Sequence, residues 1–144
     1  MTIKNCTDMY VKRLFYDELS DGKYFPSHEI ASPDWNDVEN ILLKLDGQHI
    51  SEITMDNGDE DNYLCVAGGN NGLFILYISL DDNEKLYNLL NPYSENKTNN
   101  LVTGGQSGKF EDKFCNNLES VLDVTENYFR TGGISDKYKW EILK

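Results

Sequence analysis

The chain has 144 residues, a length that fits one domain with an ordinary hydrophobic core. Its 39% hydrophobic and 12% aromatic content is typical of a globular protein and excludes a disordered chain. A formal net charge of −12 disfavours binding to nucleic acid or to an anionic membrane. Taken alone it is typical of a solvated surface that keeps the protein soluble, and the alternative is a surface that attracts a cationic protein partner.

Residues 1–6 lack the apolar run of a signal peptide, and nowhere do about 18 apolar residues follow one another. We therefore expect a cytoplasmic protein without a membrane span. Cys6, Cys65 and Cys115 are an odd number of cysteines, and their spacing matches neither a zinc site nor a disulfide framework. We expect them to be reduced, with Cys65 in the core, and we expect no metal and no cofactor.

The N-terminal residues 1–30 give the weakest signals, so we assign them only as an extension of the single domain 1–144. Residues 10–16 have the bulk of a strand, and Asp21-Gly22 is typical of a turn. Ser32 then predicts a helix N-cap, with Pro33 at the first helical position.

This first helix is expected over residues 33–45. Its apolar face would carry Trp35, Val38 and Leu42, and Gly47 is a suitable residue at which to end it. One apolar face predicts packing against a sheet.

Residues 51–56 alternate between apolar and polar side chains, as in a strand with one face toward the core. Residues 63–67 and 73–78 are rich in β-branched and aromatic residues, and the glycines and asparagines of 68–72 predict the loop of a central hairpin. The second run is apolar at six consecutive positions, so we expect a middle strand with both faces covered.

Two acidic turns flank this hairpin, at residues 56–61 and 81–84. In an up-and-down meander both turns lie at the same end of the sheet, where clustered acids would repel one another unless a cationic partner binds them. We therefore predict a partner-binding surface formed by Asp56, Asp59, Glu60, Asp61, Asp81, Asp82 and Glu84.

The C-terminal part predicts a fourth strand at 86–90, a mobile polar loop at 94–100 and a short paired segment around the glycines of 104–108. Asn116 and Glu119 resemble a capping box that starts a second helix, which ends at Gly132-Gly133. Residues 138–142 alternate as a closing strand. The order of elements predicts an α+β fold: a mainly antiparallel sheet with two helices packed on one face.

Other chemistry is poorly supported by the residues. The Gly104–Gly108 loop resembles a phosphate cradle but opens no helix, so a turn is favoured. The acids of 56–61 lack the glycine and the distant glutamate of an EF-hand loop. His28 and His49 carry no metal or nucleophile signature around them, so we expect no enzyme.

Several landmarks stand in a recognisable order over residues 35–140: Trp35, Gly68-Gly69, Gly104-Gly105-Gln106, a helix ending at Gly132-Gly133, and Trp140. In this the chain resembles the first-numbered immunity-protein family of bacterial polymorphic toxin and contact-dependent inhibition systems. Residues 1–30 and 94–100 have no counterpart in the resemblance.

The resemblance implies an α+β protein without enzymatic activity that binds one cognate toxin C-terminal domain in the producing cell. Such a toxin is commonly a nuclease or a nucleic-acid deaminase, whose basic substrate groove would attract an acidic surface. The alternative is a small-ligand-binding or enzymatic α+β domain that uses the loop from Gly104 to Gly108. The sequence does not indicate an oligomeric state.

Overall fold

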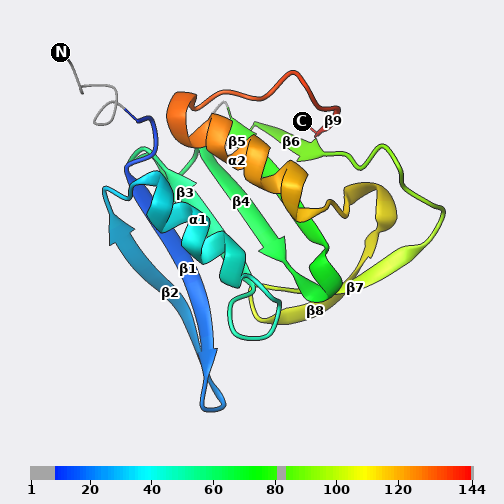
Figure 1. Ribbon diagram of the computed structural model, residues 1–144, viewed down its shortest axis with the longest axis horizontal. Helices are drawn as coiled ribbons and strands as arrows, with labels where there is room; N and C mark the ends of the chain where they lie inside the picture. The colour runs from blue at the N-terminus through cyan, green and yellow to red at the C-terminus, as the bar shows by residue number, and fades with distance from the viewer. Residues whose placement is uncertain (1–8, 81–83, 144) are drawn as a thin grey trace.

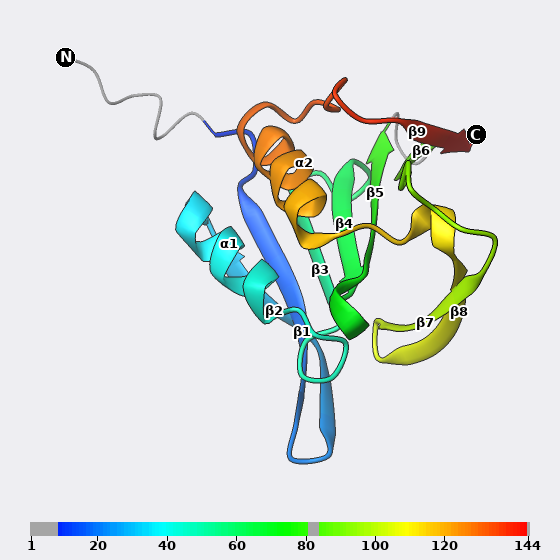
Figure 2. The same cartoon turned by 45° about the vertical axis from the view of Figure 1, so that its right-hand side comes forward.

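The computed structural model describes residues 9–80 and 84–143. Across these residues seven strands form one antiparallel sheet in the order β2-β1-β3-β4-β5-β6-β9, and β7 pairs with β8 in a separate hairpin. Figure 1 shows both α-helices in front of the sheet and the β7–β8 hairpin at the lower right, below the ends of β4 and β5, and Figure 2 shows the same arrangement turned by 45°. The predicted α+β class, with a mainly antiparallel sheet, is confirmed.

The sheet and hairpin strands are β1 (Arg13–Ser20), β2 (Lys23–Ala31), β3 (Glu52–Asp56), β4 (Tyr63–Gly68), β5 (Phe74–Leu80), β6 (Lys85–Leu89), β7 (Thr98–Thr103), β8 (Gln106–Glu111) and β9 (Trp140–Leu143). The helices are α1 (Trp35–Lys44) and α2 (Leu118–Thr131), with short 3₁₀ turns η2 (Asn70–Gly72) and η3 (Asp112–Phe114). Among the described residues, no helix is long and apolar enough to cross a bilayer.

The core lies between the helices and one face of the sheet. Strand pairing places Leu14, Met55 and Leu64 in one row across β1, β3 and β4, and each of these side chains is fully buried. Side chains alternate between the faces of a strand, so every second residue of these strands contributes to this core. Trp35 on α1 packs against the edge of this core, and the centre of its ring lies 5.7 Å from that of Phe129 on α2.

Both helices begin one or two residues later than the sequence indicated. Asp34, not Ser32, is the N-cap of α1, and it forms a reciprocal capping box with Asp37. Asn117, not Asn116, caps α2 by accepting a hydrogen bond from Ser120 N. Asn116 is buried, and its Nδ2 donates to the carbonyl oxygens of Leu89 and Phe114, which leaves the capping position to Asn117.

Residues 13–31 belong to the main sheet, which corrects their assignment to an N-terminal extension. Asp21 and Gly22 form the predicted turn, and both have positive φ, as the two-residue turn of a twisted hairpin requires. The pairing shifts between Tyr16 and Glu18, so that two residues of β2 oppose one residue of β1. One of these two residues is Pro26, which donates no backbone hydrogen bond and is tolerated at a bulge in an edge strand.

The central hairpin β4–β5 has the predicted loop, in which positive φ occurs at Gly68, Gly69, Asn71 and Gly72. Its second strand lies inside the sheet, but only one of its faces is fully covered. Phe74, Leu76 and Ile78 are buried against the helices, whereas Ile75 and Tyr77 on the other face are half-buried. The expectation that both faces of this strand are covered was therefore wrong. The polar loop expected at 94–100 also already enters β7 at Thr98.

At Gly69 the backbone of this loop lies so close to the end of α1 that there is no room for a side chain. A Cβ at Gly69 would lie 2.3 Å from the carbonyl oxygen of Leu45, whereas a Cβ at Gly72 would meet nothing within 4 Å. Both glycines have positive φ, so the pair separates backbone strain from steric overlap.

We predict that Gly69→Ala lowers the free energy of unfolding by about 3 kcal/mol or more, and that Gly72→Ala lowers it by about 1 kcal/mol. Urea unfolding followed by tryptophan fluorescence measures both. Equal losses in the two variants would show that the contact with Leu45 contributes nothing.

Candidate partner-binding site

The face of the sheet opposite the helices is covered at one end only. There the β7–β8 turn packs against it, with Gly105 N donating to Ser51 Oγ over 2.9 Å and Gly105 lying beside the ring of Tyr24. The remainder, called here the open face, presents the row Phe15, Thr54, Cys65 and Tyr77 across β1, β3, β4 and β5.

A depression lies in the middle of the open face. Of the row, Phe15, Thr54 and Tyr77 line this depression, whereas Cys65 is only 2% exposed and lies beneath the surface. The cavity has a volume of about 280 Å³. It is lined by Arg13, Phe15, Glu52, Thr54, Asp56, Glu60, Tyr63 and Tyr77, and we refer to it as the Glu52 depression.

An ion pair forms one wall of the depression. Arg13 Nε and Nη2 donate to the two carboxylate oxygens of Asp56 over 2.7 and 2.9 Å. Asp56 is only 5% exposed, and its Oδ1 also accepts from Gly58 N. The carboxylate predicted to bind a partner is thus already paired, because β1 brings Arg13 directly opposite Asp56 in the sheet.

The 56–61 turn lies at the end of the sheet where β5 ends and β6 begins. Asp56, the last residue of β3, pairs with Tyr63, the first residue of β4. Ser79 Oγ donates to the carbonyl oxygen of Asp61, and this hydrogen bond joins the 56–61 turn to the end of β5. Within the second turn Glu84 is exposed, whereas Asp81 and Asp82 lie outside the described residues.

Within the first turn, the acids differ in their partners. Asp59 accepts from Asp61 N over 2.9 Å and from Asn62 Nδ2 over 2.7 Å, and these hydrogen bonds lower the pKa of Asp59. Glu60 and Asp61 are exposed, and Glu60 also lines the depression. The turn therefore places negatively charged side chains at the solvent-exposed edge of the Glu52 depression.

A buried carboxylate, Asp17, lies next to the depression and only 2% exposed. It accepts from Ser51 N over 2.7 Å, from Glu52 N over 2.9 Å and from Tyr24 Oη over 2.9 Å, as well as from Ser51 Oγ. The carboxylate holds β1, β2 and the start of β3 together, and through Ser51 Oγ it also reaches the turn at Gly105. The hydrogen bond to Asp17 and the burial of the phenol raise the pKa of Tyr24 to about 12.

Glu52 is the unusual residue of the site. Its side chain is half-buried, and among the described residues its carboxylate accepts no hydrogen bond and forms no ion pair. Burial raises the pKa of Glu52, and the negative charge of Asp17 raises it further. A desolvated carboxylate without a counter-ion is costly, and such groups are typical of binding sites.

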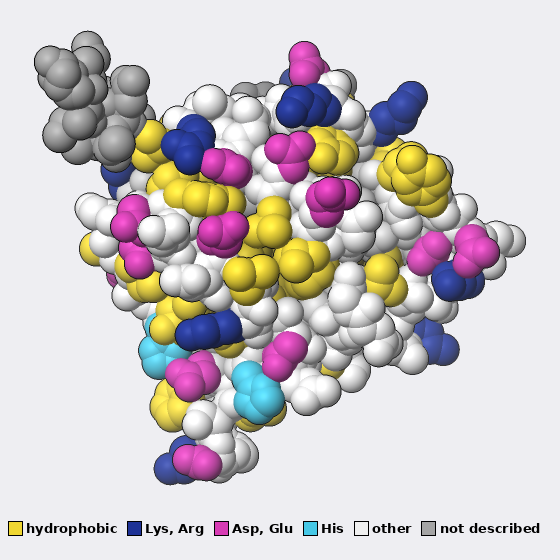
Figure 3. Space-filling model, in the orientation of Figure 1, with side chains coloured by type: hydrophobic (Ala, Val, Ile, Leu, Met, Phe, Trp, Pro, Cys, Tyr) yellow, Lys and Arg dark blue, Asp and Glu magenta, His cyan; other side chains and the backbone are white. Residues whose placement is uncertain are grey.

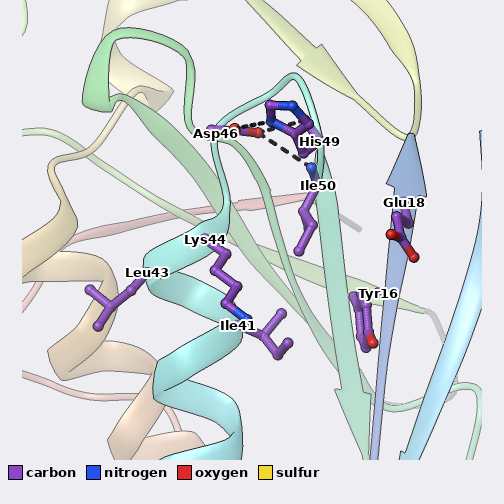
Figure 4. A pocket seen from close by; sticks show the side chains of 8 residues that line it. All are labelled: Tyr16, Glu18, Ile41, Leu43, Lys44, Asp46, His49 and Ile50. Carbon is purple, nitrogen blue, oxygen red and sulfur yellow. Dashed lines mark hydrogen bonds and ion pairs between the residues drawn. The ribbon is translucent and has the colours of Figure 1, made fainter. Parts of the chain in front are cut away.

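A second groove lies between α1 and β1, and Figure 4 shows the residues that line it. Its carboxylates are already engaged: Asp46 accepts from the ring of His49 over 2.8 Å and from three backbone amides, and Glu18 lies 2.9 Å from the ring of His28. Burial would raise the pKa of Asp46, but the hydrogen bonds from His49 and the amides lower it to about 2. No three potential ligands come together for a metal anywhere in the described part of the chain.

A third groove runs between α1 and α2, in the region where hydrophobic side chains gather in Figure 3. Trp35, Leu118 and Leu122 form its apolar part. Two of its acids are satisfied within the protein, because Asp123 accepts from Tyr138 Oη over 2.8 Å and Glu126 pairs with Arg130 over 2.7 Å. Its other two acids, Glu39 and Glu119, form no ion pair among the described residues, so this groove offers a partner an apolar surface and two unpaired carboxylates, as many as the Glu52 depression. The Glu52 depression differs because the charge of the buried Asp17 acts on one of its two unpaired carboxylates.

The glycine loop of the alternative interpretation is the turn of the β7–β8 hairpin. A Cβ at Gly104 would lie 3.1 Å from Glu52 Oε1, so the loop faces a carboxylate, which repels phosphate.

The other residues on which the family resemblance rests lie in turns, at element ends or in packing contacts. Gly68 packs beside Leu101, Gln106 is the exposed first residue of β8, Gly132 ends α2 with φ 72°, and Trp140 Nε1 donates to Ser135 O over 2.9 Å.

Comparison with known proteins identifies no relative: no family model, no curated protein and no solved structure matches the chain. The interpretation of the site therefore depends on its own residues.

The sequence predicts part of this site. The alternation of residues 51–56 already places Glu52, Thr54 and Asp56 on one face of a strand. Arg13 and Phe15 could not be found in this way, because nothing in the sequence indicates that β1 pairs with β3.

We predict that Asp17→Ala lowers the free energy of unfolding by about 2 to 4 kcal/mol, because the backbone amides of Ser51 and Glu52 lose their acceptor while buried. Chemical denaturation measures the loss. Ser51→Ala is the comparison: it removes one donor to Asp17 and the acceptor of Gly105 N, but it leaves the amides of Ser51 and Glu52 bonded to Asp17, and it should cost about 1 to 2 kcal/mol. A loss below that range for Asp17→Ala would contradict the role assigned to its carboxylate.

We also predict that Glu52→Gln raises the melting temperature at pH 7. Folding raises the pKa of Glu52 above its ordinary value of 4.5, so the folded state binds this proton more tightly than the unfolded state. The ionised carboxylate therefore costs stability above the folded pKa, and the cost disappears as the pH falls below 4.5. Thermal melts of wild type, Glu52→Gln and the exposed control Glu60→Gln between about pH 4 and pH 8 test this, and a lower melting temperature for Glu52→Gln at pH 7 would contradict it.

Proposed function

We propose that the protein is an immunity protein, which binds and neutralises one cognate toxin domain in the cytoplasm of the cell that produces both. The observation that carries this proposal is the half-buried Glu52 carboxylate, which has no counter-ion among the described residues and lies in a depression that opens toward the acidic 56–61 turn. A surface of this kind suits a cationic protein that supplies the missing charge.

The resemblance in the order of Trp35, the glycine pairs and Trp140 supports the same proposal. A toxin that acts on nucleic acid, as a nuclease or a deaminase, needs a basic groove to hold its substrate. Such a groove is complementary to an acidic surface, and charge complementarity speeds association and suppresses wrong partners.

Binding fits the arrangement better than catalysis does. His28 and His49 each contact a carboxylate at the groove beside α1, and neither lies at the Glu52 depression. Cys65 is fully buried, and burial raises the pKa of its thiol, which disfavours a nucleophilic thiolate. The loop at Gly104 faces Glu52, which does not suit an anionic substrate.

The test uses the cognate toxin domain, which we expect to be encoded by an adjacent gene and to co-purify with this protein. Replacing Asp59, Glu60 and Asp61 by lysine should weaken binding in isothermal titration by more than about tenfold, or about 1.4 kcal/mol. Asp56 is left unchanged because it belongs to the fold. Wild-type binding should also weaken as salt rises from about 0.05 to 0.5 M, through screening.

A matched control replaces three acids that do not line the Glu52 depression, Glu39, Glu119 and Asp136, by lysine. This triple variant changes the net charge equally but leaves the open face intact. It should bind almost as tightly as wild type. Equal weakening by both triple variants would mean that only the net charge attracts the toxin, and the absence of any complex with the adjacent gene product would overturn the proposal.

A further inference from the structure

The charges that line the Glu52 depression are unbalanced. Three carboxylates, those of Glu52, Asp56 and Glu60, share the lining with one cation, Arg13. Arg13 is bound by Asp56 through two hydrogen bonds, so its charge is already neutralised. Glu52 and Glu60 remain, and among the described residues neither has a counter-ion.

Of these two, Glu52 has more to gain from a cation. Its carboxylate lies inside the depression, half-buried and close enough to Asp17 to be destabilised by that charge. A bound cation would offset both burial and repulsion, because an opposite charge within about 4–6 Å favours the ionised form of an acid. Glu60, which is exposed, keeps its hydration and gains less.

Aromatic rings line the same depression, and the strand register puts Tyr63 at its Asp56 end and Tyr77 in the row of Thr54. The rings of Tyr63 and Tyr77 lie 6.0 Å apart in an edge-to-face arrangement. On the opposite wall the guanidinium carbon of Arg13 lies 5.2 Å from the centre of the Phe15 ring, so the site already contains one cation–ring contact. Aromatic faces attract cations, and a planar guanidinium can stack on a ring while it donates to a carboxylate.

The size of the depression limits the ligand. A volume of about 280 Å³ lies at or below the lower bound of about 300 Å³ for pockets that hold drug-sized molecules. It suits one long side chain. Because the open face continues on both sides of the depression, that side chain can be carried by a protein surface that lies over the sheet.

We propose that the Glu52 depression binds the guanidinium group of one arginine side chain of the partner protein. Glu52 accepts its hydrogen bonds, Tyr63 and Tyr77 contact its planar face, and Glu60 adds long-range attraction at the rim. This inference rests on the proposed function and names the anchor of the complex. The α1–α2 groove, with its apolar floor, is the competing surface.

The experiment uses the whole protein and a small probe, N-acetyl-arginine methylamide, followed by amide chemical shifts in NMR. The neutral control is N-acetyl-citrulline methylamide, which has the same shape without the charge. We expect saturable shifts at Thr54, Tyr63 and Tyr77 with a dissociation constant on the order of 1 to 10 mM, and no saturable response to citrulline. Glu52→Gln should weaken binding of the arginine probe by about tenfold, whereas Glu119→Gln at the competing groove should leave it unchanged.

A second measurement uses pH. The charged and titratable groups around Glu52 among the described residues are Asp17 and Arg13 on β1, Tyr24 on β2, Asp56 on β3, Tyr63 and the buried Cys65 on β4, Tyr77 on β5, and Glu60 in the turn. As the pH falls from about 7 to below the ordinary Glu52 pKa of 4.5, protonation of Glu52 should weaken binding of the arginine probe to wild type. The loss should persist in Glu60→Gln and vanish in Glu52→Gln, which separates Glu52 from its neighbours.

Three results would overturn the inference: an equal response to citrulline, shifts centred on Trp35 and Leu122 in the α1–α2 groove, or no saturable shift at all. The probe assay contains no toxin, so its failure would remove the arginine site and leave the toxin titration to decide the proposed function. Conversely, arginine binding at Glu52 without any toxin complex would overturn the immunity proposal alone.

Discussion

The carboxylate of Asp17 is the interaction on which the rest of the structure depends. It is buried, yet it accepts hydrogen bonds from Ser51 N and Glu52 N at the start of β3 and from Tyr24 Oη on β2. A buried charge is tolerated only when its hydrogen-bonding capacity is filled, so each of these donors must be in place before the sheet is stable. The β1–β2 edge and the start of β3 are therefore coupled through one side chain.

The same charge shapes the candidate site. Asp17 is fixed by the fold, and its negative charge acts on Glu52, the next carboxylate along the open face. The two acids differ in what surrounds them: Asp17 has protein donors, whereas Glu52 has none among the described residues. Folding thus places Glu52 where its charge is costly, and a cationic ligand would remove the cost. Stability and binding are opposed at this position, which is common at functional sites.

The parts of the fold that the sequence predicts are those set by local patterns. The alternation of 51–56, the glycines and asparagines of 68–72, and the apolar spacing of both helices each act within a few residues. The parts that were missed depend on distant contacts. Asp17 meets Ser51 34 residues away, and Arg13 meets Asp56 43 residues away. Within residues 13–31, the charged Asp17 and Pro26 interrupt the apolar pattern of a strand. The structure explains both, because Pro26 lies at the bulge and Asp17 is hydrogen-bonded by three residues.

The acids of this protein divide by what they contact rather than by where they cluster in the sequence. Asp46, Asp56 and Asp112 each accept from backbone amides, and a short aspartate side chain reaches such amides readily in turns. These residues contribute to the net charge but stabilise loops. The acids left for a partner are those without internal donors, above all Glu52 and Glu60, whose longer side chains extend away from their own backbone. A cluster of acids in a sequence therefore predicts more partner-binding carboxylates than the structure leaves available. Asp56 is the example, because its carboxylate is already paired with Arg13.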